Sequence, residues 1–115
     1  MNLKEYKRRA VEVVTLPSGL QIKVRRNISQ YTFMKICAER GITFDEEGKV
    51  AQDKLVELTE GLLRAYIVEP KMPEEWDVED LLSEDFLFLY ERVMSAVSGR
   101  ERESIRQIAE EQGDF

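Results

Sequence analysis

A β-hairpin pattern between residues 11 and 25 limits the folds open to this chain more than any other feature. Val11-Glu12-Val13-Val14-Thr15-Leu16 is rich in β-branched residues, and Leu20-Gln21-Ile22-Lys23-Val24-Arg25 alternates apolar and polar side chains. Between them, Pro17-Ser18-Gly19 predicts a three-residue loop, in which proline starts a type I turn and glycine takes the left-handed conformation after it. The chain therefore has to build its fold around a two-stranded ribbon.

The turn also predicts how the two strands pair. It gives three opposing pairs, Leu16 with Leu20, Val14 with Ile22, and Glu12 with Val24. One face of the ribbon is then apolar and consists of Val14, Leu16, Leu20, Ile22 and Val24, while the other carries Gln21, Lys23 and Arg25 towards water. A two-stranded ribbon is only marginally stable alone, so we expect helices to cover the apolar face.

Two helical patterns follow the hairpin. The first begins after the N-cap residue Ser29, ends before Gly41 as a C′ glycine, and carries apolar residues at helical spacing, namely Phe33, Met34, Ile36 and Cys37. The second ends near Val68, because Pro70 pushes the residue before it out of helical geometry; its apolar stripe is Leu55, Leu58, Leu62 and Tyr66. Gly61 in its middle costs about 1 kcal/mol relative to alanine, so we expect another backbone to approach closely there.

A proline-bounded linker and a third helical pattern complete the order of elements. The linker covers residues 71–76, Asp77 caps a short turn through Leu82 with Asp80 at its third position, and Ser83 is the expected N-cap of a helix that ends near Gly99. The sequence thus predicts an α+β, mainly α fold, with an N-terminal β-hairpin packed on a bundle of three to four helices. We expect one domain over residues 11–99, a basic and partly disordered arm over 1–10, and a charged helical tail over 100–115.

Charge is divided unevenly along the chain. Residues 1–40 hold 9 Lys+Arg and 3 Asp+Glu, a net of +6, and residues 41–115 hold 8 and 20, a net of −12. Six of these nine basic residues form the candidate basic set of the arm and the hairpin, namely Lys7, Arg8, Arg9, Lys23, Arg25 and Arg26. With an overall pI near 4.8 we expect no nucleic-acid partner. The hairpin face with Lys23 and Arg25 is either simply solvated or binds an acidic protein surface. That surface could belong to another protein or to the acidic half of another copy of the chain.

Residues for catalysis are missing from the sequence. It contains no histidine, and its single cysteine, Cys37, lies on the apolar side of a predicted helix, where a core role is expected. Asp45-Glu46-Glu47-Gly48 lacks the ligand spacing of a calcium loop. We therefore expect no enzyme, no metal and no cofactor. No apolar run is long enough to span a membrane, and no apolar segment follows the basic start as in a signal peptide.

The best candidates for partner binding lie between residues 76 and 89. Trp76 either anchors the linker or forms an exposed interface anchor. The helix from Ser83 carries apolar residues on more than one side, so it is either central to the bundle or bound to another molecule. The predicted partner-binding residues are Trp76, Leu81, Leu82, Phe86, Phe88 and Leu89, together with Lys23 and Arg25.

In this order, these pieces resemble the small tail assembly chaperones of long-tailed bacteriophages and prophages. Three segments carry the resemblance: Leu16-Pro17-Ser18-Gly19-Leu20 with Lys23-Val24-Arg25-Arg26, then Leu62-Leu63-Arg64-Ala65-Tyr66-Ile67-Val68-Glu69-Pro70-Lys71, and finally Leu81-Leu82-Ser83-Glu84-Asp85-Phe86-Leu87-Phe88-Leu89-Tyr90. After the first helix, where family members often have a glycine-proline break, this chain has Arg40-Gly41-Ile42-Thr43-Phe44.

The resemblance implies a protein of the host cytoplasm that is absent from the mature virion. Such a chaperone binds the tape measure protein, and keeps it soluble while tail tube subunits polymerise around it. An alternative from another class is a virion structural adaptor or a tail-terminator-like protein that forms a ring. A third is a small nucleic-acid-binding regulator that uses the basic arm and the hairpin.

Overall fold

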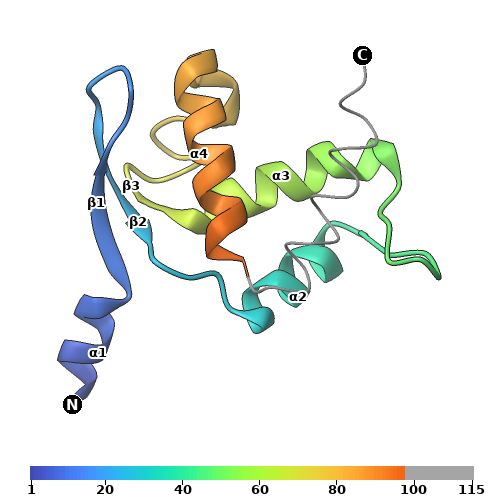
Figure 1. The fold of residues 1–115 in the computed structure, drawn as a ribbon, viewed down its shortest axis with the longest axis horizontal. Helices are drawn as coiled ribbons and strands as arrows, with labels where there is room; N and C mark the ends of the chain where they lie inside the picture. The colour runs from blue at the N-terminus through green and yellow to red at the C-terminus, as the bar shows by residue number, and fades with distance from the viewer. Residues whose placement is uncertain (98–115) are drawn as a thin grey trace.

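A computed structural model describes residues 1–97 of the chain. Its elements are α1 (Leu3–Arg9), β1 (Val11–Thr15), β2 (Gln21–Arg25), α2 (Gln30–Glu39), α3 (Gln52–Tyr66), β3 (Ile67–Glu69), the 3₁₀ turn η1 (Val78–Asp80) and α4 (Ser83–Ala96) (Figure 1). The fold is α+β and mainly α, with the N-terminal hairpin that the sequence predicts. The predicted tail over 100–115 lies outside the described residues.

The hairpin has the predicted register. Val14 pairs with Ile22 and Glu12 pairs with Val24, and Gly19 adopts a φ of 99° in the loop. Its amide donates a hydrogen bond of 2.8 Å to the carbonyl of Leu16. The prediction for Leu20 was wrong, because this side chain is exposed while the others of the apolar face are buried. Leu20 still belongs to the loop, since β2 begins only at Gln21, so the alternation of the strand does not reach it.

A third strand, which the sequence patterns did not predict, makes β2 the centre of an antiparallel sheet with the order β1-β2-β3. The helix expected to continue to about Val68 ends at Tyr66, and Ile67 pairs with Val24. Pro70 excludes helical geometry just beyond this point, Ile67 and Val68 are β-branched, and β2 offers an unpaired edge. The backbone therefore satisfies its hydrogen bonds in the sheet instead of in another helical turn.

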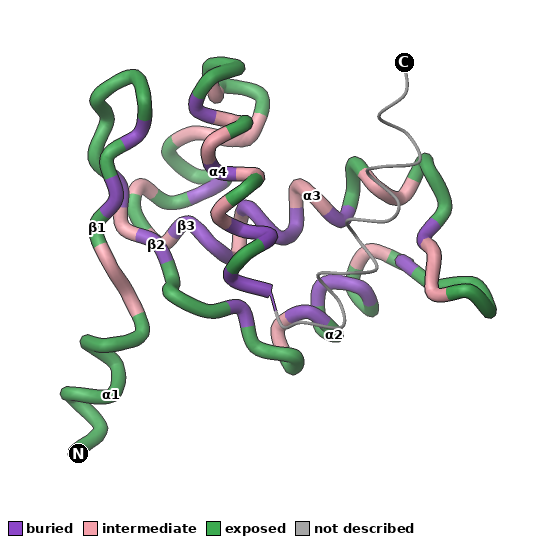
Figure 2. The backbone as a smooth tube through the Cα atoms, in the orientation of Figure 1, coloured by how far each residue is buried: buried purple, intermediate pink, exposed green. Residues whose placement is uncertain are grey.

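The core is formed by residues of the sheet, α2, α3 and α4, and Figure 2 shows buried residues along each of these elements. The predicted stripe of α3 is confirmed, with Leu58, Leu62 and Tyr66 buried and Leu55 partly buried. Among the helices of residues 1–97, none combines the length and the apolar character needed to cross a bilayer.

Helices α2 and α3 approach each other closely at Gly61, although the nearest atoms belong to side chains and not to another backbone as expected. A Cβ atom built on Gly61 would lie 2.6 Å from Cγ2 of Ile36 and 2.9 Å from Nε of Arg40. Ser29 caps α2, because its hydroxyl accepts a hydrogen bond of 3.1 Å from the amide of Thr32. Glycine at position 61 thus lets α2 pack directly on the backbone of α3.

Helix α4 begins differently from the prediction. Ser83 is its first residue and Leu82 its N-cap, which has no capping side chain, so the assignment of Ser83 as N-cap was wrong. The carboxylate of Asp85, which is buried, accepts hydrogen bonds from the amide of Ser18 at 3.0 Å and from its hydroxyl at 2.6 Å. This acidic side chain in the first turn of α4 therefore holds the hairpin loop.

The C-terminal end of α4 is bonded to the segment between β2 and α2. The amide of Ile28 donates a hydrogen bond of 2.8 Å to the carbonyl of Ala96, and Ile28 forms a parallel bridge with Val97. Arg92 of α4 donates a hydrogen bond of 3.0 Å to Glu12 of β1. Helix α4 is thus tied to the hairpin loop, to β1, and to the segment that leads into α2.

Candidate functional site

The partner-binding residues predicted on α4 do not form one open surface. Leu89 is a fully buried core residue. The ring of Phe86 lies 6.1 Å from the ring of Tyr90, and the guanidinium carbon of Arg92 lies 5.6 Å from the centre of the Phe88 ring. Among the predicted residues of α4 and its N-cap, Leu82 is an exposed large apolar side chain. Leu87, which the prediction omitted, is also exposed, five residues further along the chain.

Trp76 and Leu81 hold the linker in place. Both are partly buried against the core, and the indole N–H of Trp76 donates a hydrogen bond of 2.9 Å to the carbonyl of Pro70. Asp77 caps η1 in a capping box with Asp80, as the sequence predicts. The structure therefore gives Trp76 the anchoring role rather than that of an exposed tryptophan.

The two basic residues predicted on the hairpin also have contacts within the chain. The ammonium of Lys23 lies 3.9 Å from the carboxylate of Glu69 across the β2–β3 pair. Nε of Arg25 donates a hydrogen bond of 3.1 Å to the carbonyl of Ala65, in the last turn of α3. Arg25 thus satisfies a backbone acceptor that the helix end leaves open.

An apolar groove lies instead between α2 and the segment that follows it. It has a volume of about 750 Å³ and is lined by Phe33, Met34, Cys37, Ala38, Ile42 and Phe44, with Asp45, Glu46, Glu47 and Gly48 at its acidic side. The Met34 side chain is 62% exposed and that of Phe44 is 38% exposed. We call this feature the α2 groove. Exposed methionine and phenylalanine side chains in a hollow are typical of surfaces that bind apolar faces of proteins.

The end of α2 shapes one wall of the α2 groove. Gly41 has a φ of 65°, as predicted for a C′ glycine, and the amide of Ile42 donates a hydrogen bond of 2.8 Å to the carbonyl of Cys37. This hydrogen bond joins the second residue beyond the C-cap to the third residue before it, which marks a Schellman motif. In this motif the chain turns back beside the last helical turn. The turn brings Phe44 over Phe33, with the two ring centres 6.1 Å apart.

A tight turn forms the acidic wall of the α2 groove. Phe44 and Val50 form an antiparallel bridge, and the carboxylate of Asp45 accepts hydrogen bonds of 2.9 Å from the amides of Glu47 and Lys49. Asp45 is therefore used to hold the turn. Glu46 and Glu47 are exposed, although the ammonium of Lys49 lies 3.4 Å from Glu47.

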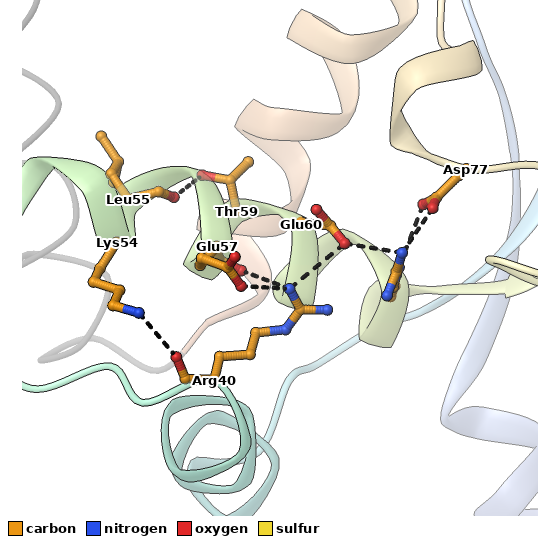
Figure 3. A network of polar contacts seen from close by, with 8 residues as sticks. Arg40, Lys54, Leu55, Glu57, Thr59, Glu60 and Asp77 are labelled. Carbon is orange, nitrogen blue, oxygen red and sulfur yellow. Dashed lines mark hydrogen bonds and ion pairs between the residues drawn. The ribbon is translucent and has the colours of Figure 1, made fainter.

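A polar network on α3 fixes the position of α2 (Figure 3). Nη1 of Arg40, at the end of α2, lies 3.2 Å from Glu57 and 3.6 Å from Glu60. Glu60 in turn lies 2.8 Å from Nη2 of Arg64, which lies 2.7 Å from Asp77. The chain of charges connects α2, α3 and η1, so it supports the frame on which the α2 groove is built.

This network predicts a pH dependence of stability. The hydrogen bond from Arg64 and the amide of Val78 lower the pKa of Asp77 below its ordinary value. A lowered pKa in the folded state adds stability above about pH 4, which is lost as the pH falls through the folded pKa. Asp77→Asn should therefore destabilise the protein in urea titrations at pH 7, and the difference from wild type should shrink near pH 3. Glu79→Gln, at an exposed neighbour, should show no such trend; an equal difference at both pH values would contradict this role of Asp77.

An apolar residue away from the buried side of α2 is the sequence signal for the α2 groove, since Met34 is exposed while Phe33, Ile36 and Cys37 are buried. Among residues 1–97, no three His, Cys, Asp or Glu side chains are placed to hold a metal ion.

Comparison of the chain with family models, curated proteins and solved structures gave no match.

Proposed function

We propose that this chain is a phage tail assembly chaperone that binds an amphipathic helical segment of the tape measure protein in the α2 groove. In this role it keeps the tape measure protein soluble in the host cytoplasm while tail tube subunits assemble, it is absent from the finished virion, and it performs no catalysis. The observation that carries the proposal is an apolar groove of about 750 Å³ with acidic residues on one side.

The shape and charge of the α2 groove support a helical ligand. Helix-binding grooves take the apolar face of an amphipathic helix, and charged residues at their edges pair with the polar face. Phe33 and Phe44 provide a rigid apolar floor, and Met34 can adapt its conformation to different side chains. The exposed Glu46 favours ligands with lysine or arginine beside the apolar face. The family resemblance supplies the identity of the ligand, a long helical protein that aggregates when unprotected.

Co-expression with the tape measure protein of the same phage tests the proposal. The wild-type chain should yield a soluble complex that survives purification. Met34→Glu places a charge on the apolar floor and should weaken binding at least about tenfold, as expected for a central interface residue. Titration calorimetry with a soluble helical fragment of the tape measure protein measures this loss.

Two exposed positions serve as matched controls. Val56→Glu on α3 and Leu87→Glu on α4 introduce the same charge at exposed apolar residues that do not line the α2 groove. Both variants should bind like wild type. A tape measure protein that stays insoluble with the wild-type chain rejects the proposed function, whereas loss of binding in Leu87→Glu alone moves the site to α4.

A further inference from the structure

The chain carries a second unpartnered element, helix α1, whose chemistry matches the α2 groove. Every residue of α1 is exposed, including Leu3 at 68% and Tyr6 at 66%. The helical period places Leu3, Tyr6 and Ala10 on one side, with Lys7 and Arg9 at the flanks of this stripe. The element is therefore a basic amphipathic helix that presents its apolar side to water.

A helix of this length needs a partner to cover it. Isolated helices shorter than about 12 residues are marginal in water, and α1 has 7 residues, with Asn2 as N-cap accepting a hydrogen bond from Glu5. Residues 1–10 hold 4 Lys+Arg and 1 Asp+Glu, a net of +3. An apolar groove bordered by Glu46 and Glu47 is the complementary surface on the same chain.

Helix α1 is fixed far from the α2 groove of its own chain. It ends at Arg9, and β1 starts at Val11, so only Ala10 separates them. The carbonyl of Ala10 accepts a hydrogen bond of 2.9 Å from the amide of Arg26, which attaches the junction to the end of the hairpin. In Figure 1, α1 projects from one side of the molecule, while the segment after α2 lies on the opposite side. A covering groove must therefore come from another molecule.

We infer that α1 of one copy docks in the α2 groove of a second copy. Leu3 and Tyr6 enter the apolar floor beside Met34 and Phe44, and Lys7 or Arg9 faces Glu46. Residues 98–115 have 3 Lys+Arg and 5 Asp+Glu, a net of −2, and so lack the charge that this acidic side favours. The contact is head-to-tail, since each copy offers one arm and one groove, and it extends into chains of copies unless the geometry closes a ring.

This inference deepens the proposed function, because it names a competitor for the same groove. A tape measure helix would displace the arm and release single copies. The contact is small, so we expect weak self-association that rises with protein concentration, between about 10 µM and about 1 mM.

Sedimentation velocity over this range tests the inference with two complementary variants. Tyr6→Glu has a defective arm and an intact groove, and Met34→Glu has an intact arm and a defective groove. Each variant alone should be monomeric at concentrations where the wild type forms oligomers. An equimolar mixture should form a heterodimer and nothing larger, because only one arm and one groove remain functional. An interface in which α1 packs on α1, or one α2 groove packs on another, would not be restored in this way.

Two controls separate loss of the contact from loss of the fold. Tyr6 and Met34 are exposed, so both variants should keep the thermal midpoint of the wild type, and Val56→Glu should keep its oligomers. Oligomers that persist in Tyr6→Glu, or a mixture that stays monomeric, overturn the inference. The two proposals can fail separately: Tyr6→Glu should still bind the tape measure fragment, so loss of self-association without any fragment binding would reject the proposed function alone.

Discussion

Replacing Gly61 with valine is expected to destabilise the protein by about 2–3 kcal/mol, the usual cost of inserting a branched side chain into a packed interface. The new Cβ would lie 2.6 Å from Cγ2 of Ile36. This methyl group could move only by rotation about χ1, and isoleucine in a helix has one strongly preferred χ1 rotamer, so α2 has to move instead. Valine is a slightly better helix former than glycine, but this gain of a few tenths of a kcal/mol is much smaller. Urea denaturation at pH 7 measures the difference.

Two further substitutions assign the loss to this contact. Val56→Gly makes the reverse exchange at a position of α3 that is 71% exposed, and it should cost less than about 1 kcal/mol. Ile36→Ala removes the clashing atom, so it should cost less in the Gly61→Val background than in wild type. Equal costs in both backgrounds would mean that α2 and α3 do not press on each other at Gly61. Because α2 also forms one wall of the α2 groove, Gly61→Val should weaken fragment binding as well.

Asp85→Ala is the second large effect, with an expected loss of about 2 kcal/mol, in the range for hydrogen bonds to a charged acceptor. The substitution removes the acceptor for both the amide and the hydroxyl of Ser18. The hairpin loop then loses its attachment to α4, and hydrogen exchange at the amides of Ser18 and Gly19 should accelerate more than elsewhere in the sheet. The stability loss is measured by chemical denaturation and the local effect by exchange.

Glu84→Ala is the matched control, because Glu84 occupies the same first turn of α4 and is exposed. Both carboxylates lie near the helix N-terminus, where each contributes about 0.3–1 kcal/mol through the helix dipole. The control should lose no more than this. Ser18→Ala in the Asp85→Ala background should add little, and additive losses of the two single variants would show that the bond between the Ser18 hydroxyl and Asp85 contributes nothing.

Local rules were sufficient for much of the fold. The hairpin register follows from Pro17 and Gly19, the start of α2 from Ser29, and the α2–α3 contact from Gly61. Each of these features depends on a few adjacent residues or on one unusual residue. Gly61 is such a residue, because glycine inside a helix lowers its stability relative to alanine and so indicates a packing reason. This is the information that a sequence carries without knowledge of the tertiary structure.

The features that were missed depend on distant residues. Strand β3 forms because β2 has an open edge, and Asp85 is buried because the hairpin loop lies against α4. The predicted α4 surface depended on an excess of apolar residues, and packing uses much of that excess for the core, Leu89 above all. The α2 groove needs the turn at Gly41 to bring Phe44 over Phe33, which helical spacing alone does not indicate.

The pairing of Ile28 with Val97 also determines when the protein can fold during its synthesis. The hairpin loop needs Asp85, and the backbone before α2 needs the carbonyl of Ala96. Until residue 97 has left the ribosome, the nascent chain displays the apolar side of its hairpin to every neighbouring polypeptide. The fold is therefore completed only after α4 has emerged, and a ribosome-bound chain that stops before α4 stays open to proteases and to cellular folding factors.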